Sequence, residues 1–201
     1  LTEMLGKVKF EIEPANKKSD IGIVRGLAWT SVGGDTLEIE VNSMPGKADM
    51  ILTGQIGDVM QESARIALTY VRSIVSKKPY NVDVEFFENN CIHLHIPEGA
   101  VPKDGPSAGV TMATAILSAV AQIPVKADIA MTGEINLRGK VLPIGGLKEK
   151  LLAAKSAGIK TVLVPIKNKS DVEEFDKEIT DGIQIEYMTD MKQVLENALD
   201  I

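Results

Sequence analysis

The amino-acid sequence predicts a mixed α/β fold of the α+β sort, in which a β-rich part precedes a run of βαβ units. In residues 1–56 apolar side chains often recur at every second position, which is the period of half-buried strands. Residues 58–76 carry apolar side chains at helical spacing, so one face of that helix is core. After residue 128 short apolar runs alternate with helical segments. We therefore expect a single domain over residues 1–201, with its β-rich part at about 1–56 and its α/β part at about 57–201.

Glycine, proline and asparagine residues divide the β-rich part into strands. We expect these strands at residues 8–12, 21–30, 37–41 and 50–53. A turn at residues 31–35 joins the second strand to the third. Asp58 then begins the long helix, with Gln61 at the spacing of a capping box.

A β-hairpin is predicted next, because alternating apolar side chains at residues 82–86 and 92–96 flank a turn at residues 89–90. His93 and His95 lie on the other face of its second strand. Two histidines without an obvious third ligand are weak evidence for a metal, so we expect no metal site.

The α/β part contains the remaining elements. Helices are predicted at residues 110–121, 146–157, 170–179 and 189–199. Strands are predicted at residues 128–132, 161–165 and 183–187, and a hairpin over residues 134–142 turns at residues 138–139. Gly158 is the expected stop of the second helix.

Composition restricts the possible functions. The net charge of −6 argues against an electrostatic grip on nucleic acid by this chain. Cys91 is the sole cysteine, so no disulfide can form within the chain, and a reducing, cytoplasmic compartment is expected. The longest apolar run, residues 110–125, is shorter than the ~20 residues of a membrane span. No secretory segment opens the chain, and its first residue is not Met, which indicates a fragment of a longer protein. No GxxxxGK[ST] motif occurs, so we expect this chain not to bind ATP by itself.

A serine and a lysine are presented in a way that suggests a Ser–Lys hydrolase. Ser107 follows the turn residues Gly105 and Pro106 and precedes an apolar helix, and Lys150 lies in a second, glycine-led helix. A serine hydroxyl needs a positioned base to accept its proton. Lysine can serve only when neutral, and burial favours the neutral form because desolvation penalises the ammonium.

The helical positions around Lys150 indicate whether this lysine is buried. At about 100° per residue, Lys150 lies among Leu147, Ala154 and Ala157, whereas Lys148 lies toward the polar side. The pattern therefore favours Lys150 over Lys148 as the base. The alternative is that the Lys150 amine reaches solvent from the edge of a core helix.

Ser107 also has more than one interpretation. A serine near a helix start is usually an N-cap, although Asp104 is an equally good candidate for that role. If Asp104 is the cap, Ser107 lies in the first helical turn, where free N–H groups could stabilise an oxyanion. A pairing of Ser107 with His93 or His95 across the intervening loop also stays open.

Longer runs of residues carry more specific information than these single positions. They are GLAWT (26–30) with GG (33–34), LTGQIGDVM (52–60) with ESA (62–64), HLHIPEGA (93–100), PKDGPSAG (102–109), MTGE (131–134), LRG (137–139) and VLPIGGLKEK (141–150). With these runs, nearly the whole chain resembles the proteolytic domain of the ATP-dependent Lon protease, of the bacterial LonA type. Every catalytic position of that family's pattern is matched.

The resemblance implies a role for each matched position. Ser107 is expected to be the nucleophile, Lys150 the general base, and Thr132 the residue that orients the lysine through a hydrogen bond. Asp104 is expected to contact the lysine or to hold the loop when the site is inactive. Family positions near the site but outside the dyad are His93 and His95, and the oxyanion site and substrate cleft are expected at Gly105, Pro106, Ala108 and Trp29.

The resemblance also implies a ribosomal-protein-S5-like topology and a set of partners. Family members carry an N-terminal substrate-recognition region and an AAA+ ATPase module, and they work as hexameric rings. ATP and Mg are expected to belong to that upstream module, so no cofactor is expected in this chain. We expect a serine endopeptidase domain acting on unfolded, damaged or tagged polypeptides, without membrane or nucleic-acid binding. The alternatives are a non-catalytic Lon-like ring-assembly module and an ATP-independent Lon-like peptidase.

Overall fold

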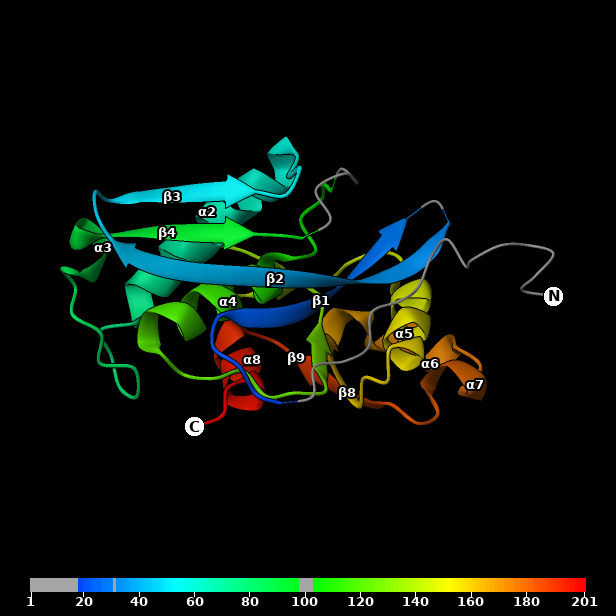
Figure 1. Ribbon diagram of the computed structural model, residues 1–201. Coiled ribbons are helices and arrows are strands. Elements are labelled where there is room, and N and C mark those ends of the chain that lie inside the picture. The colour runs from blue at the N-terminus through cyan, green and yellow to red at the C-terminus, as the bar shows by residue number, and fades with distance from the viewer. Residues whose placement is uncertain (1–17, 31, 98–102) are drawn as a thin grey trace.

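The computed structural model of the protein describes residues 18–30, 32–97 and 103–201. At its centre is a seven-stranded mixed sheet in the order β3-β4-β2-β1-β5-β8-β9 (Figure 1). The strands are β1 (Ile23–Thr30), β2 (Gly33–Pro45), β3 (Asp49–Thr53), β4 (Asn90–His95), β5 (Ile129–Met131), β8 (Thr161–Pro165) and β9 (Gln184–Met188). The β1–β2 and β2–β4 pairs are antiparallel, and the other pairs in this sheet are parallel. The predicted α/β class is confirmed, and strands from both parts of the chain lie in the same sheet.

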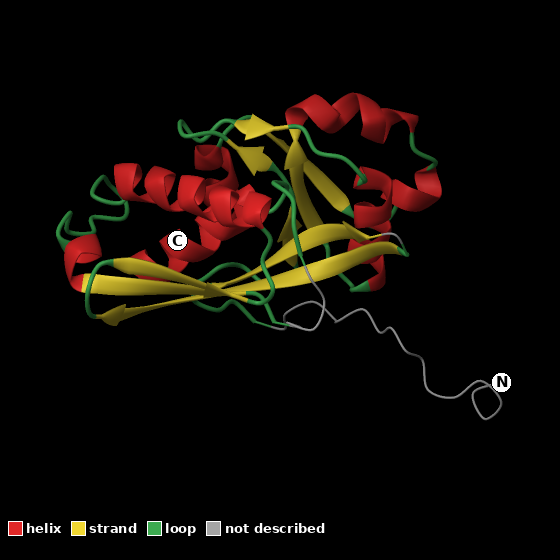
Figure 2. Cartoon of the chain, turned by 90° about the horizontal axis from the view of Figure 1, so that it is seen from above, coloured by secondary structure: helices red, strands yellow, loops and turns green. Residues whose placement is uncertain are grey.

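Helices pack on both faces of this sheet. The helices on one face are α2 (Asp58–Ile74), α4 (Gly109–Ala121) and α8 (Met191–Ala198), and those on the other are α5 (Leu147–Ser156), α6 (Lys169–Glu174) and α7 (Lys177–Thr180). Along β1, Val24 belongs to the first of the two cores and Leu27 to the second, because successive strand residues point to opposite faces. In Figure 2 the helices that cover β2 and β4 lie to one side of these long strands.

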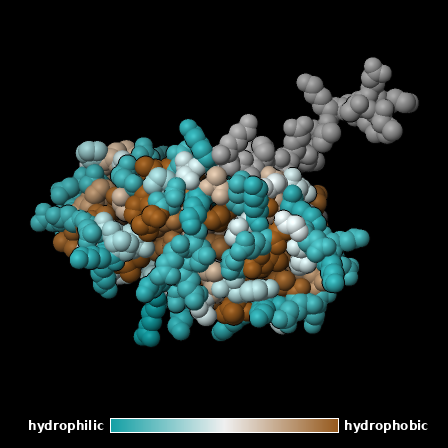
Figure 3. Space-filling view, turned by 90° about the horizontal axis from the view of Figure 1, so that it is seen from below, coloured by the Kyte–Doolittle hydropathy of each residue, from teal (hydrophilic) through white to brown (hydrophobic). Residues whose placement is uncertain are grey.

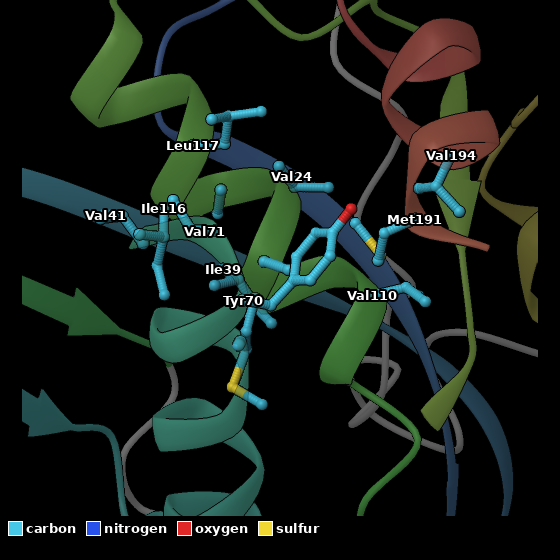
Figure 4. Close-up of a cluster of buried hydrophobic side chains, with 14 of the residues drawn as sticks. Val24, Ile39, Val41, Tyr70, Val71, Val110, Ile116, Leu117, Met191 and Val194 are labelled. Carbon is cyan, nitrogen blue, oxygen red and sulfur yellow. The ribbon is translucent and has the colours of Figure 1, made fainter. Parts of the chain in front are cut away.

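The first core is built around α4, which is buried from Gly109 to Val120. Its side chains meet those of α2, α8 and the sheet, and Figure 4 shows Ile116 and Leu117 of α4 in the same cluster as Tyr70 of α2 and Met191 of α8. A helix that is apolar on every side needs such neighbours all around it. α4 therefore anchors the loop that precedes it, which carries Ser107.

The predicted hairpin over residues 82–96 is wrong. Residues 82–85 form no strand, and the short helix α3 (Phe86–Asn89) leads into β4. Both edges of β4 are occupied by β2 and β3, so no edge is left for residues 82–86. The Asn89 and Asn90 amides donate to the Glu85 and Phe86 carbonyls and so stabilise the helical turn.

Two predicted helix features also differ. Asp58 begins α2 as predicted, but the capping box is wrong, because Gly57 is the N-cap and the Gln61 side-chain amide donates to the Ile56 carbonyl. The predicted helix at 170–179 is two short helices, α6 and α7, because the chain is extended at Phe175, which packs against the second core. The strand predicted at residues 8–12 lies outside the described residues.

The strand predicted at residues 37–41 is longer, because β2 begins four residues earlier and ends four residues later, and residues 33–35 of the predicted turn pair with β1. The other predicted elements are found within one or two residues of their expected bounds. The hairpin at 134–142 is the two-stranded ribbon β6 (Glu134–Ile135) and β7 (Val141–Leu142), and η1 (Ile166–Asn168) is a 3-10 turn before α6. Gly158 follows the end of α5 with φ +77°, as its expected stop.

Polar and apolar side chains are interspersed on the face seen in Figure 3. Among the helices of the described residues, none combines the length and the apolar character that crossing a bilayer would require.

Candidate active site

The loop before α4 is held by the segment that leads into α2. The Lys103 amide donates to the Gln55 carbonyl (2.9 Å), and the Gly57 amide donates to the Lys103 carbonyl (2.7 Å). The Asp104 carboxylate accepts from the amides of Met60 and Gly105, both at 2.9 Å. Asp104 therefore caps α2 from across the loop instead of capping α4.

Ser107 lies in the turn immediately before α4. The N-cap of α4 is Ala108, and no side chain caps this helix. The Ser107 hydroxyl is thus not used as a helix cap, and its side chain is half-buried. Of the two cap candidates suggested by the sequence, neither caps α4.

The end of β5 fixes the position of the Ser107 backbone. The Gly133 amide donates to the Ser107 carbonyl (2.8 Å), and the Val110 amide donates to the Gly133 carbonyl (3.1 Å). The Thr132 hydroxyl is 3.5 Å from the same Ser107 carbonyl. Thr132 and Gly133 follow β5 directly. The central sheet therefore determines where the loop that carries Ser107 lies.

The Lys150 side chain extends from α5 to the same residue, Thr132. It lies in the first turn of α5 with only 3% of its surface exposed, and its Nζ donates to the Thr132 hydroxyl at 3.2 Å. Leu147, Ala154 and Ala157 are buried with it, whereas Lys148 is exposed, so the predicted helical face is confirmed. Burial lowers the pKa of the Lys150 amine from 10.5 to about 8.

Ser107 and Lys150 line one pocket of about 560 Å³. Trp29 lies at this pocket with 60% of its surface exposed, and residues 143–145 form another part of the pocket wall. The other lining residues are Leu27, Ala28, Thr30, Asp35, Thr36, Leu37, Met60, Lys103, Asp104, Pro106, Ala108 and Glu134. The Ser107 hydroxyl and the Lys150 amine thus belong to residues that line one common space.

The structure does not bring every predicted residue to this pocket. His93 and His95 do not line it; their rings contact the Thr53 hydroxyl at 2.9 and 2.6 Å, between β3 and β4. Gly105 does not line it either, although its φ of +117° shapes the turn before Ser107. The arrangement favours the pairing of Ser107 with a lysine over a pairing with a histidine.

Asn168 supports the pocket wall and was not singled out by the sequence. Its buried side-chain amide accepts from the Ile144 amide (3.0 Å) and donates to the Ile144 carbonyl (2.9 Å) and to Asp171 (2.8 Å). An asparagine just before a predicted helix suggests only a cap. Its partner lies 24 residues away in the chain, so nothing local could have revealed the contact.

No group of three or more His, Cys, Asp or Glu side chains in residues 18–30, 32–97 and 103–201 is arranged to hold a metal ion.

Comparisons with a family model and with curated proteins point to the same family. The family model for the Lon protease (S16) C-terminal proteolytic domain matches residues 1–201. The chain is 61% identical over 199 residues to a Lon protease of Lachnoclostridium phytofermentans, covering 99% of this chain and 24% of that protein. It is 55% identical over 197 residues to Lon protease 1 of Syntrophobacter fumaroxidans, covering 98% and 24%. It is 53% identical over 199 residues to a Lon protease of Clostridioides difficile, covering 99% and 25%. The chain thus spans about a quarter of the length of these relatives.

Proposed function

Since the chain belongs to the Lon protease (S16) C-terminal proteolytic domain family, we propose that it is a serine endopeptidase domain with Ser107 as nucleophile and Lys150 as general base. The observation that carries this assignment is the buried Lys150 amine, which lies beside Thr132 in the pocket that Ser107 also lines. A lysine placed this way gains a neutral fraction near physiological pH, and that fraction is what a base requires.

These positions support the following acylation step. Neutral Lys150 takes the proton of the Ser107 hydroxyl, and the serine oxygen bonds to the carbonyl carbon of the substrate peptide. The carbonyl oxygen becomes an oxyanion. When the tetrahedral intermediate collapses, the carbon–nitrogen bond breaks, and the Lys150 ammonium gives its proton to the departing amine. Water then attacks the acyl-serine with Lys150 again as base, which releases the acid product and restores Ser107.

The oxyanion would be held at the start of α4. The Gly109 and Val110 amides already donate to the Pro106 and Gly133 carbonyls. Within the described part of the chain, the amides of Ser107 and Ala108 have no such acceptor. They precede the positive end of α4, and we propose these two as the oxyanion donors.

The role of Thr132 in this proposal is orientation. Its hydroxyl accepts from Lys150 and lies near the Ser107 carbonyl, so one side chain relates the base to the loop of the nucleophile. Asp104 acts further back, by fixing the loop on α2.

The proposal extends to the longer protein. The relatives are about four times as long as this chain, which leaves room for an AAA+ ATPase module and a substrate-recognition region. We propose that Mg-ATP acts in that module, and that the protein degrades unfolded, damaged or tagged polypeptides in the cytoplasm as a homo-hexamer. Nucleic acid and membrane would not be bound by this domain.

Intact-mass detection of Ser107 acylation by a peptidyl β-lactone tests the assignment. The wild type should gain one acyl group, whereas Ser107→Ala and Lys150→Met should gain none. Lys148→Met is the matched control, because Lys148 is exposed two residues before the base, and it should label like the wild type. Labelling that survives Lys150→Met would refute the base role. Absence of labelling in the wild type would favour the ring-assembly module instead.

A further inference from the structure

The first turn of α5 determines where the Lys150 amine lies. The Lys150 amide donates to the Gly146 carbonyl (3.1 Å), so its backbone is set by the way this helix begins. From that backbone the side chain reaches Thr132 in a nearly solvent-free space. A small displacement of the turn would move the amine away from both Thr132 and the pocket.

The β1–β2 hairpin lies directly on this turn. A Cβ atom added to Gly34 would lie 2.0 Å from the Glu149 carbonyl oxygen, 2.5 Å from its carbon and 3.1 Å from the Lys150 nitrogen. These are backbone atoms, which cannot rotate aside as the end of a flexible side chain can. The Glu149–Lys150 peptide therefore rests on the bare Cα of Gly34.

Space, and not backbone conformation, explains the glycine. The φ angle of Gly34 is not positive, so a residue with a side chain could adopt the same backbone angles. Gly33, next to it, is the opposite case, with φ +125° and open space around its Cβ position. Of these two glycines, Gly34 is the one whose missing side chain permits contact with α5.

A second contact approaches the same turn from β1. Trp29 is the register partner of Gly34, and a Cβ on Gly146 would lie 2.8 Å from Trp29 Cγ. Gly146 is the N-cap of α5, with φ +67°. The pair Trp29–Gly34 thus touches the turn at two points, one before Leu147 and one at the peptide of Lys150.

We propose that Gly34 is a positioning residue for Lys150. Its bare backbone lets the hairpin pack on the Glu149–Lys150 peptide and so fixes the amine relative to Thr132 and Ser107. This inference rests on the proposed function of Lys150 as base. It adds a constraint from β2, a strand that carries none of the proposed catalytic groups.

The test is the pH dependence of Ser107 acylation by the peptidyl β-lactone, on the complete chain, for wild type and Gly34→Ala. In Gly34→Ala the turn must move, which loosens the burial of Lys150. We expect acylation of the folded protein to slow by about tenfold or more, and the pH midpoint of the rate to move upward toward the ordinary range of lysine. Val32→Ala is the control: Val32 is at the same hairpin tip and 84% exposed, and its profile should match the wild type.

The readouts separate the possible outcomes. A Gly34→Ala protein that melts at lower temperature but keeps the wild-type midpoint and rate per folded molecule would overturn the positioning role. If Gly34→Ala does not fold, Trp29→Ala removes the second contact without adding atoms. Because Trp29 also lines the cleft, only its midpoint is compared, and an unchanged midpoint would again overturn the inference. A wild type whose acylation does not depend on pH or on Lys150 would instead refute the proposed function itself.

Discussion

Lys150 carries a structural cost that its proposed role as a base would explain. The residue is 3% exposed, and burial lowers the pKa of its amine to about 8, so at neutral pH most molecules carry a buried ammonium. The Thr132 hydroxyl compensates for part of the lost hydration by accepting its hydrogen bond. A structural lysine at this position would gain stability by reaching water, whereas a base gains from being held away from it.

The cost of burying the Lys150 ammonium predicts how the free energy of unfolding depends on pH. Unfolded Lys150 keeps its proton up to its ordinary pKa of 10.5, whereas the folded protein releases it near 8, so unfolding takes up a proton between these values. The contribution of this group to stability therefore rises with pH across that window, by about 3 kcal/mol at most. Lys150→Met should raise the unfolding free energy at pH 7, and the gain should shrink toward pH 10.5, as measured by denaturant titration. Lys148→Met should show no such dependence; a pH-independent effect of Lys150→Met would contradict the buried-charge argument.

Thr132 provides a second prediction at this scale. Thr132→Val keeps the shape of the side chain but removes the hydroxyl that Lys150 contacts, so we expect acylation of Ser107 to fall by about tenfold or more. Loss of an acceptor for the ammonium should also lower the pKa of Lys150. Thr132→Ser retains the hydroxyl and should stay close to wild type. Equal rates for the valine and serine variants would show that the contact has no role in the reaction.

At the level of elements, the site depends on contacts between segments that are distant in the chain. Asp104 joins the serine loop to the start of α2, and Asn168 joins the pocket wall to the turn before α6. In both cases a polar side chain forms hydrogen bonds with backbone groups of another segment. Without these bonds, the backbone groups would lack a partner and the free energy of unfolding would fall. These contacts join irregular segments to the start of α2 and to the turn before α6.

Asn168 gives the prediction for this scale. Asn168→Ala leaves the partly buried amide and carbonyl of Ile144 without their partner, so the unfolding free energy should fall by about 2 kcal/mol. Because Ile144 lines the pocket, loss of its contact with Asn168 should raise KM for peptide substrates more than it lowers kcat. Asn197→Ala is the control, because the Asn197 amide bonds the Gln193 carbonyl on α8, away from the pocket. If KM stays unchanged in Asn168→Ala, the wall does not contribute to substrate binding.

On the scale of the whole molecule, one sheet connects two cores. Leu117 of α4 lies in the core on one face, and Leu151 of α5 lies in the core on the other, both with no exposed surface. The strands between them come from both the β-rich part and the α/β part. The two cores should therefore unfold together.

Calorimetry of core variants tests this expectation. Leu117→Ala and Leu151→Ala should each leave a single cooperative transition. Each should lower the free energy of unfolding of that transition by about 2–5 kcal/mol. Leu152→Ala, next to Leu151 but 41% exposed, should change it far less. Two separate transitions, each sensitive to only one of the core variants, would contradict a single cooperative domain.

The accuracy of the sequence prediction varied with how local its signal was. Period-two alternation at residues 37–41 and helical spacing at 147–157 depend on neighbouring residues, and both elements are present. The hairpin at 82–96 failed although its pattern was equally regular. β4 pairs there with β2 and β3 instead, because pairing partners are chosen by the whole sheet. The broken helix at 170–179 failed for a related reason, since Phe175 turns toward the second core.

The sequence by itself determined the fold class, the family, and the helical face on which Lys150 lies. These properties depend on periodicity and on long motifs, both of which are written in the order of residues. Only the tertiary structure decided that Asp104 caps α2 and that His93 and His95 lie away from the pocket. It also decided that Asn168 contacts Ile144 of the pocket wall and that Gly34 contacts the Glu149–Lys150 peptide. Each of these contacts joins residues far apart in the chain, and such distances are set by packing, not by local sequence.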